Sequence, residues 1–128
     1  MPTPLIDSNW LNADICSQLQ ILEQSSPGFL QKLINGFIVR QSRSIADASL
    51  MVAHADLEKL RATAHTLKGS AASLGAYVLS QLAGDLEQAA RDADLTQCRV
   101  LMEAIPSAFD STERALRQWL DAAPRKPA

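Results

Sequence analysis

Apolar residues recur along most of the chain at steps of three and four, which is the spacing of one face of an α-helix. Val, Ile, Thr and Tyr do not gather into the alternating runs that a half-buried strand needs. The pattern therefore predicts an all-α protein, built as an antiparallel four-helix bundle with an additional N-terminal helix.

Capping residues, proline and glycine divide the pattern into five predicted helices. The first begins near Ser8 or Asn9 as N-cap and ends at the stretch "SSPG". The second is long and runs from Pro27, which suits a first helical turn, to about His54. Its apolar positions mark it as a core-forming helix.

The third helix is predicted to begin after an N-cap at Asp56, and it carries a bundle-type apolar seam. Gly75 stands where a helix commonly ends in a left-handed residue, and a fourth helix follows over residues 76–92. The tight turn between them predicts antiparallel neighbours. The seam consists of Leu57, Leu60, Ala64, Leu67, Ala71 and Leu74.

A fifth helix is predicted from a cap at Asp94 to about Leu120. Pro106 interrupts its pattern, and proline inside a helix removes a backbone hydrogen bond and bends the rod. We therefore expect a kink or break around Ile105.

The length of 128 residues and the 47% hydrophobic content fit one globular domain with a single core. We expect a flexible N-terminus over residues 1–7, the bundle over 8–122 and a flexible, proline-containing tail over 123–128. No stretch approaches the roughly 20 apolar residues of a membrane span, and no secretory leader is apparent, so we expect a cytoplasmic protein.

The formal charge of −2 provides no basic field of the strength that holds proteins on nucleic acid or anionic lipid. We therefore expect protein partners rather than nucleic acid or a membrane. Cys16 and Cys98 lie far apart and outside any cluster with metal-ligand spacing. They are interpreted as free buried thiols in a reducing compartment.

The stretch "HTLKGSAASLG", residues 65–75, contains the candidate chemistry. On a helical wheel His65 points roughly 130° away from the centre of the apolar seam, and Gly69 lies almost opposite it. His65 is therefore predicted at the surface among short side chains, where Gly69 leaves room for an approaching group. A lone exposed histidine is usually without function, and His54 is interpreted in that way.

Two further residues are predicted to support His65. Lys68, three residues on, can bring an ammonium near whatever His65 holds, although a solvated lysine without a task is the alternative. If the third and fourth helices pack antiparallel, Glu87 lies at the height of His65 and can orient one ring nitrogen. The alternative for Glu87 is an ordinary surface acid.

The segment "AHTLKGSAASLGA", residues 64–76, closely resembles the signature of histidine-containing phosphotransfer (Hpt) domains. In that signature Lys-Gly follows the histidine by three and four residues, and a second glycine follows it by ten. The "LE" at Leu86 and Glu87 also stands at the usual distance downstream. The resemblance covers the bundle from about Leu30 to Leu120.

The resemblance implies a phosphorelay carrier, not an enzyme, that is covalently phosphorylated on histidine. In the manner of the family, His65 would accept a phosphoryl group through Nε2 from a receiver-domain aspartate of a hybrid sensor histidine kinase, and pass it to the aspartate of a response regulator. Lys68 would counter the phosphoryl charge, and Glu87 would orient the imidazole. The resemblance implies no cofactor in this chain, because Mg²⁺ belongs to the acidic site of the partner receiver domain. The expected docking surface consists of Arg61, Ala62, Gly69, Ala72 and Ser73, with Gly75 in a structural role.

Three other functions compete with this one. The dimerisation helix of a sensor histidine kinase usually has an acidic residue after its histidine, whereas Thr66 follows His65 here. The sequence offers no set of acids, metal ligands or phosphate-cradling loop that an independent hydrolase would need. A helical-bundle docking or inhibitory adaptor without phosphotransfer stays open. Because the chain begins with methionine and has no fused receiver or kinase, we expect a free-standing carrier. We expect a monomer, because bundles of the Hpt type close their own core within one chain.

Overall fold

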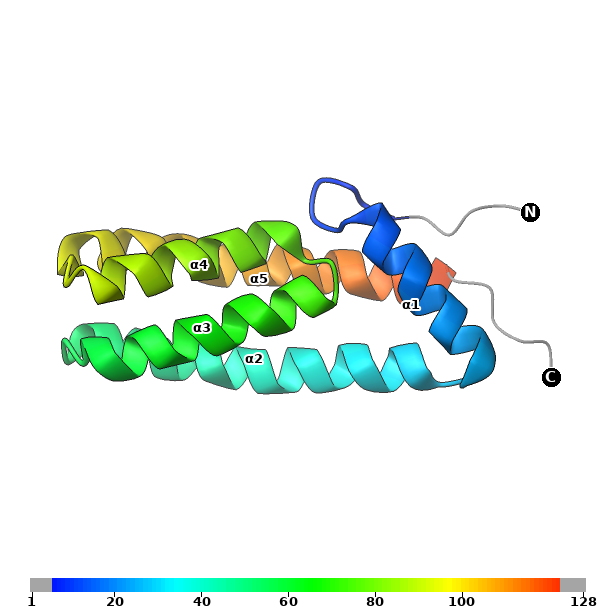
Figure 1. The fold of residues 1–128 in the computed structure, drawn as a ribbon, viewed down its shortest axis with the longest axis horizontal. Helices are drawn as coiled ribbons and strands as arrows, with labels where there is room; N and C mark the ends of the chain where they lie inside the picture. Colours follow the sequence, from blue (N-terminus) through cyan, green and yellow to red (C-terminus); the bar gives the residue numbers. More distant parts are fainter. Residues whose placement is uncertain (1–5, 123–128) are drawn as a thin grey trace.

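A computed structural model describes residues 6–122 of the chain. These residues form five helices and no strand, as the all-α prediction requires: α1 (Ala13–Ser25), α2 (Phe29–Ala53), α3 (Leu57–Ser73), α4 (Tyr77–Arg91) and α5 (Leu95–Ala122). The four long helices lie side by side as a bundle, and α1 crosses one end of it (Figure 1). The predicted flexible tail over 123–128, and the predicted flexible N-terminus apart from Ile6 and Asp7, lie outside the described residues.

Helix α1 begins later than predicted, so the assignment of Ser8 or Asn9 as N-cap is wrong. The cap is Asn12, whose side chain accepts a hydrogen bond from the backbone N–H of Ile15 at 3.0 Å. The preceding residues form a turn in which the N–H groups of Trp10 and Leu11 both donate to the carbonyl of Asp7. In a helix capped at Ser8 the N–H of Asn12 would donate to the carbonyl of Ser8, whereas here it donates to the carbonyl of Gly75.

Both ends of α1 are tied to the bundle. At its start, the N–H of Asn12 donates to the carbonyl of Gly75 at 2.7 Å, in the turn between α3 and α4. At its end, the carboxylate of Glu23 accepts hydrogen bonds from the N–H groups of Gly28 and Leu30 at 3.0 and 2.9 Å. Glu23 thereby satisfies backbone donors at the start of α2 that no residue of α2 caps.

The start of α2 also differs from the prediction. Pro27 is not in the helix, because Gly28 adopts a left-handed backbone with φ of 91° and serves as the N-cap. The predicted end is confirmed, since His54 is the C-cap after Ala53.

The helices α3 and α4 follow the sequence pattern closely. Asp56 caps α3 by accepting from the N–H of Lys59 at 3.4 Å, and Gly75 has the predicted left-handed φ of 75°. Gly75 is doubly constrained, since a Cβ there would also lie 3.1 Å from the Cβ of Ile15 on α1. The turn makes α3 and α4 antiparallel neighbours (Figure 1).

Helix α5 is capped by Asp94 as predicted, with the N–H of Gln97 donating to its side chain at 3.0 Å. The helix runs without interruption past Pro106, so the prediction of a break is wrong, whereas the bend that a proline introduces stays a prediction. Pro106 is exposed, while Ile105 and Phe109 are buried. A proline in a helix interior costs about 3 kcal/mol, and the burial of Ile105 and Phe109 offsets a cost of that size, so the helix persists.

The core lies between the four long helices. The predicted seam of α3 is confirmed, because its residues are buried except for Leu57, which is half-buried and packs against the core. The two cysteines, Cys16 and Cys98, are free and fully buried. Burial raises the pKa of the Cys16 thiol to about 11. The largest fully buried side chains include Trp119, Leu30, Ile34, Leu60, Leu79, Ile105 and Leu116.

Candidate functional site

His65 lies on the outward face of α3, as the helical wheel predicts. Its side chain is 64% exposed, although its neighbours Ala64 and Leu67 belong to the core. A Cβ built on Gly69, one turn later, would have no atom within 4 Å. The short residues Ala62, Ala72 and Ser73 are exposed on the same helix. The imidazole therefore lies on an open part of α3 where the neighbouring side chains are short.

Glu87 is a buried acid on α4 that faces His65. Its side chain is only 5% exposed, and its Oε2 lies 2.9 Å from Nδ1 of His65. The ammonium of Lys68 lies 2.9 Å from its Oε1, and Nη2 of Arg91 lies 3.1 Å from Oε2. The structure thus brings together the three residues predicted from sequence, His65, Lys68 and Glu87, and it adds Arg91.

The ionised carboxylate of Glu87 selects one tautomer of the neutral imidazole. The hydrogen bond from Lys68, and after it the one from His65, hold the pKa of Glu87 below its ordinary value although burial opposes them. An ionised carboxylate can only accept hydrogen bonds, so Nδ1 of His65 carries the proton in this contact. In the neutral ring Nε2 then holds the lone pair and is the nucleophilic nitrogen.

Comparisons with known proteins agree with this geometry. The model of the Hpt domain family matches residues 18–125, which is most of the chain. The chain belongs to the Hpt domain family. Membership supports histidine phosphotransfer in a phosphorelay, and the adaptor without phosphotransfer is not favoured.

The sequence identity to an individual curated relative is low. The phosphorelay intermediate protein YPD1 of Candida albicans is 29% identical over 76 residues, which are 59% of this chain and 41% of that protein. The chain therefore matches about two fifths of the length of this curated relative.

Solved structures share the fold of this Hpt domain at low identity. The maize histidine-containing phosphotransfer protein ZmHP2 superposes with a TM-score of 0.82 at 23% identity, covering 91% of this chain and 87% of its own. The phosphotransfer protein HptB of Pseudomonas aeruginosa PAO1 gives a TM-score of 0.80 at 22% identity, covering 88% of this chain and 95% of its own.

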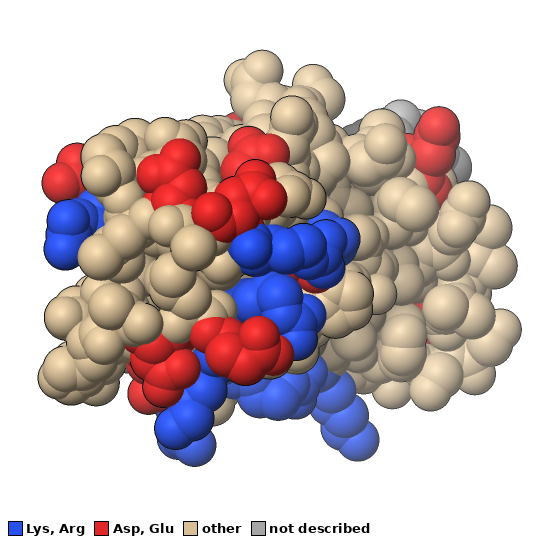
Figure 2. Space-filling model, turned by 60° about the vertical axis from the view of Figure 1, so that its left-hand side comes forward, with Lys and Arg blue, Asp and Glu red and all other residues tan. Residues whose placement is uncertain are grey.

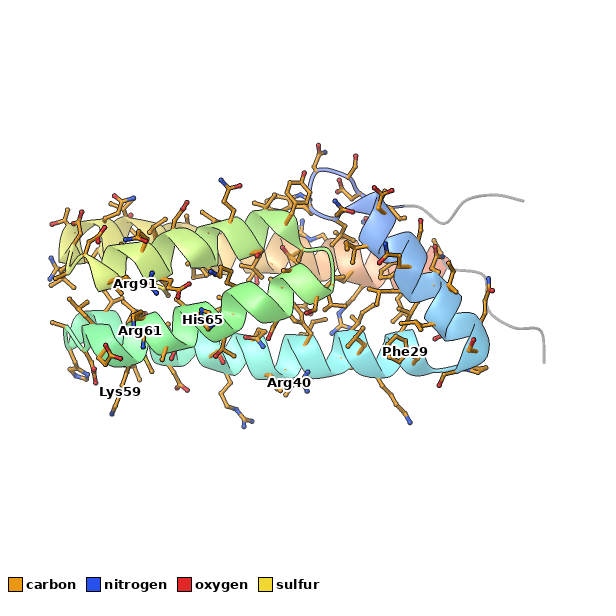
Figure 3. The ribbon with its side chains drawn as sticks, in the orientation of Figure 1. Phe29, Arg40, Lys59, Arg61, His65 and Arg91 are labelled. Carbon is orange, nitrogen blue, oxygen red and sulfur yellow. The ribbon has the colours of Figure 1, made fainter. Side chains whose placement is uncertain are left out.

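Basic residues surround the histidine of the Hpt domain. Figure 3 shows Arg61 and His65 on α3 and Arg91 on α4, all on the same side of the bundle. The guanidinium of Arg61 donates to Glu58 at 2.8 Å, and this pairing raises the pKa of Arg61. In the space-filling view, Lys and Arg side chains form a band with acidic groups beside it (Figure 2). The predicted docking role of Arg61 and the short residues stays a prediction.

Arg91 was missed by the sequence analysis, although a signal was present. It follows Glu87 by four residues on the same helix, which is the spacing of an ion pair on one face. The sequence could show the pair but not that Glu87 is buried. A buried carboxylate needs charged or hydrogen-bonding partners, and this need is what gives Arg91 a role at the site.

Among residues 6–122, two of the surface hollows of the Hpt domain involve α1 or the turn that follows it. One, of about 460 Å³, adjoins the site and is lined by Lys68 and Ala72 on α3, Tyr77 and Gly84 on α4, and Ile15 on α1, among others.

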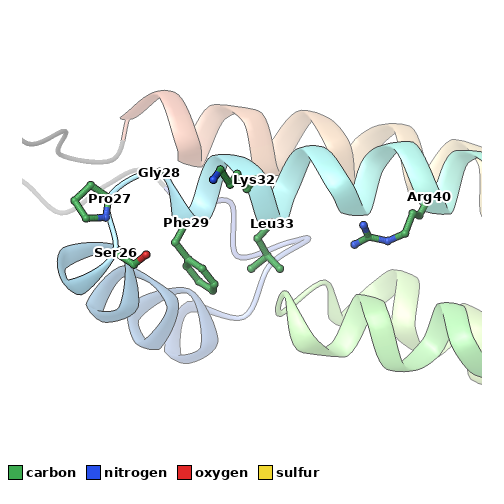
Figure 4. A pocket seen from close by; sticks show the side chains of 7 residues that line it. All are labelled: Ser26, Pro27, Gly28, Phe29, Lys32, Leu33 and Arg40. Atoms are coloured by element: carbon green, nitrogen blue, oxygen red, sulfur yellow. The ribbon is translucent and has the colours of Figure 1, made fainter.

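The other, of about 340 Å³, is lined by residues from the α1–α2 turn and α2, namely Ser26, Pro27, Gly28, Phe29, Lys32, Leu33 and Arg40 (Figure 4). None of the predicted site residues lines this second hollow.

The described residues also bear on metals and membranes. Among residues 6–122, no group of three or more His, Cys, Asp or Glu is placed to hold a metal ion. Within the same range, none of the helices combines the length and apolar character needed to cross a membrane.

Proposed function

We propose that this Hpt domain accepts a phosphoryl group on Nε2 of His65 from a receiver-domain aspartate of a hybrid sensor histidine kinase, and passes it to the aspartate of a response regulator. The observation that carries the proposal is the pairing of an exposed imidazole with a buried carboxylate. His65 is 64% exposed, while Glu87 at 5% exposure holds Nδ1 and leaves Nε2 for reaction.

The transfer forms one bond and breaks another. The lone pair of Nε2 attacks phosphorus, and the bond from phosphorus to the aspartyl oxygen breaks, so the aspartate leaves as a carboxylate with its electron pair. The proton on Nδ1 stays in the hydrogen bond to Glu87, which stabilises the positive charge that develops on the ring. Onward transfer is the same reaction in reverse, with the aspartate of the second receiver as nucleophile.

Lys68 and Arg91 supply the positive charge that phosphoryl transfer needs. Phosphoryl transfer is catalysed mainly by positioning and by neutralising charge on the phosphoryl oxygens. The ammonium of Lys68 has three donors and uses one on Glu87, so others are available for phosphoryl oxygens. Its side chain is 42% exposed, which leaves it open to an incoming group.

The partner supplies what this chain does not. In this proposal the receiver domain contributes Mg²⁺ and its acidic residues, and the Hpt domain acts without a cofactor of its own, as a carrier rather than an enzyme. We propose further that it works as a monomer in the cytoplasm, without binding nucleic acid or a membrane. The exposed short residues around His65, including Gly69, would let the receiver backbone approach.

The test is transfer of labelled phosphate from a phosphorylated receiver domain. We expect label that is stable to alkali, lost in acid and absent in the His65→Gln variant. The chain offers a matched control, because its other histidine, His54, is exposed at the end of α2, and His54→Gln should label normally. If the wild-type protein binds receiver domains but takes no label from any of them, the proposal is wrong and the adaptor function replaces it.

A further inference from the structure

Gly84 occupies the middle of α4, where glycine is costly. A glycine in a helix interior is less favourable than alanine by about 1 kcal/mol. Gly84 lies within the regular helix Tyr77–Arg91 and does not need the left-handed backbone that Gly75 adopts at the preceding turn. Its presence calls for a reason other than conformational freedom.

The reason is the path of the Lys68 side chain. A Cβ at Gly84 would lie 3.1 Å from Cδ of Lys68 and 3.9 Å from its Cγ. The shorter distance is tighter than ordinary van der Waals contact, so the stem of Lys68 would have to move. Gly69 differs, because a Cβ there meets nothing within 4 Å. The two glycines near the site therefore have different tasks.

Helix α4 holds Lys68 at three points along one stripe. The hydroxyl of Ser80 donates to the backbone carbonyl of Lys68 at 3.0 Å. One turn later Gly84 leaves space for the stem, and at the next turn Oε1 of Glu87 lies 2.9 Å from the ammonium. Positions 80, 84 and 87 are spaced by four and three residues, which puts them on the same face of the helix.

We propose that Gly84 is a positioning residue for phosphotransfer: its missing side chain forms a channel on α4 that directs the Lys68 stem to Glu87 and so holds the ammonium beside His65. This inference rests on the proposed function of His65. It adds a residue that does not touch the phosphoryl group and acts through Lys68.

The Gly84→Ala variant separates positioning from folding, because the two effects have opposite signs. Alanine favours the helix, so the variant should be as stable as the wild type or more stable. Transfer should nevertheless slow by about fivefold at saturating receiver, as expected for partial loss of one charge-assisted hydrogen bond. The receiver concentration for half-maximal rate should not change, since the surface around Gly69 is intact.

The matched control is Gly36→Ala on α2. A Cβ at Gly36 would meet the guanidinium of Arg40 at 2.8 Å, which is the far end of a flexible side chain and no part of the site. We expect this variant to transfer at the wild-type rate. Lys68→Ala and the double variant Lys68→Ala with Gly84→Ala complete the set.

The measurements are the single-turnover transfer rate and the NMR signal of the Lys68 ammonium. If Gly84 acts through Lys68, the double variant transfers at the rate of Lys68→Ala alone. In the Gly84→Ala variant, the ammonium signal of Lys68 no longer shows the ion pair with Glu87. Equal rates for wild type and Gly84→Ala, or additive losses in the double variant, would overturn the proposal. If the wild type takes no label, the proposed function fails, and the NMR signal alone decides whether Gly84 directs Lys68.

Discussion

Replacing Glu87 by alanine should disturb the protein in two measurable ways. The change removes the acceptor for His65, Lys68 and Arg91 together, while the imidazole stays exposed. We expect the proton on the ring to redistribute from Nδ1 toward Nε2, because nothing then favours the Nδ1 form. A proton on Nε2 blocks the nucleophilic lone pair, so transfer should slow.

The magnitudes follow from the exposure of the three partners. Their side chains are 64%, 42% and 54% exposed, so solvent screens each pair. At about 0.5 kcal/mol for each exposed pair, with about 0.8 kcal/mol for the lost buried methylene, the free energy of unfolding should fall by about 2 kcal/mol. Losing the preferred tautomer should slow transfer about tenfold, which corresponds to about 1.4 kcal/mol.

The assays are urea unfolding, nitrogen NMR of the His65 ring and single-turnover transfer. The pKa of Glu87 is lowered in the folded protein, so its stabilisation is present above the ordinary value of 4.5 and is lost as the pH falls through the lowered pKa. The stability difference should therefore be full at neutral pH and shrink as the pH falls below 4.5 and through the lowered pKa. Glu103→Ala, at an exposed position on α5, serves as control. An unchanged tautomer and a rate within twofold of wild type would refute the reasoning.

Three further predictions concern the rest of the chain. Gly69→Gln should raise the free energy of unfolding by about 0.5 kcal/mol through helix propensity, yet slow transfer by blocking the receiver; unimpaired transfer would remove the explanation for this glycine. Glu23→Ala should cost about 1 kcal/mol in urea unfolding, because backbone donors at the start of α2, including the N–H of Leu30, lose their acceptor. Those donors lower the pKa of Glu23, so the cost should be present above the ordinary value of 4.5 and disappear in more acidic urea titrations; a cost that is independent of pH would contradict this. Cys16 and Cys98 should resist iodoacetamide in the folded state and react after unfolding, because both are buried and burial raises the pKa of each thiol; rapid labelling of the native protein would show that the core opens there.

Much of α3 and α4 could be predicted from the sequence because the signals are local. A cap at Asp56, a seam repeating every three and four residues, and a glycine that ends the helix each act within one or two turns. The position of His65 outside the seam follows from the same periodicity. The pairing with Glu87 needed only one further assumption, an antiparallel turn at Gly75, which the structure confirms.

The parts that the sequence could not reveal depend on contacts between distant segments. Asn12 replaces the predicted cap of α1 because its backbone bonds to Gly75, which is far away in the chain. Glu23 looks like an ordinary helical acid, and only the folded chain shows that it caps α2. The task of Gly84 was equally hidden, because a single glycine in a helical pattern does not tell which side chain will cross it.

Only one ring nitrogen of His65, Nε2, is left for reaction, and this has a kinetic consequence for the proposed relay. Because Glu87 holds the other nitrogen, donor and acceptor domains must visit the same face of α3 by turns. The carrier would follow ping-pong kinetics, with a phosphorylated form that lives between two separate encounters. An abundant receiver that is not phosphorylated would then act as a competitive inhibitor, and the flux through the relay would depend on the ratio of the two receivers as well as on their affinities.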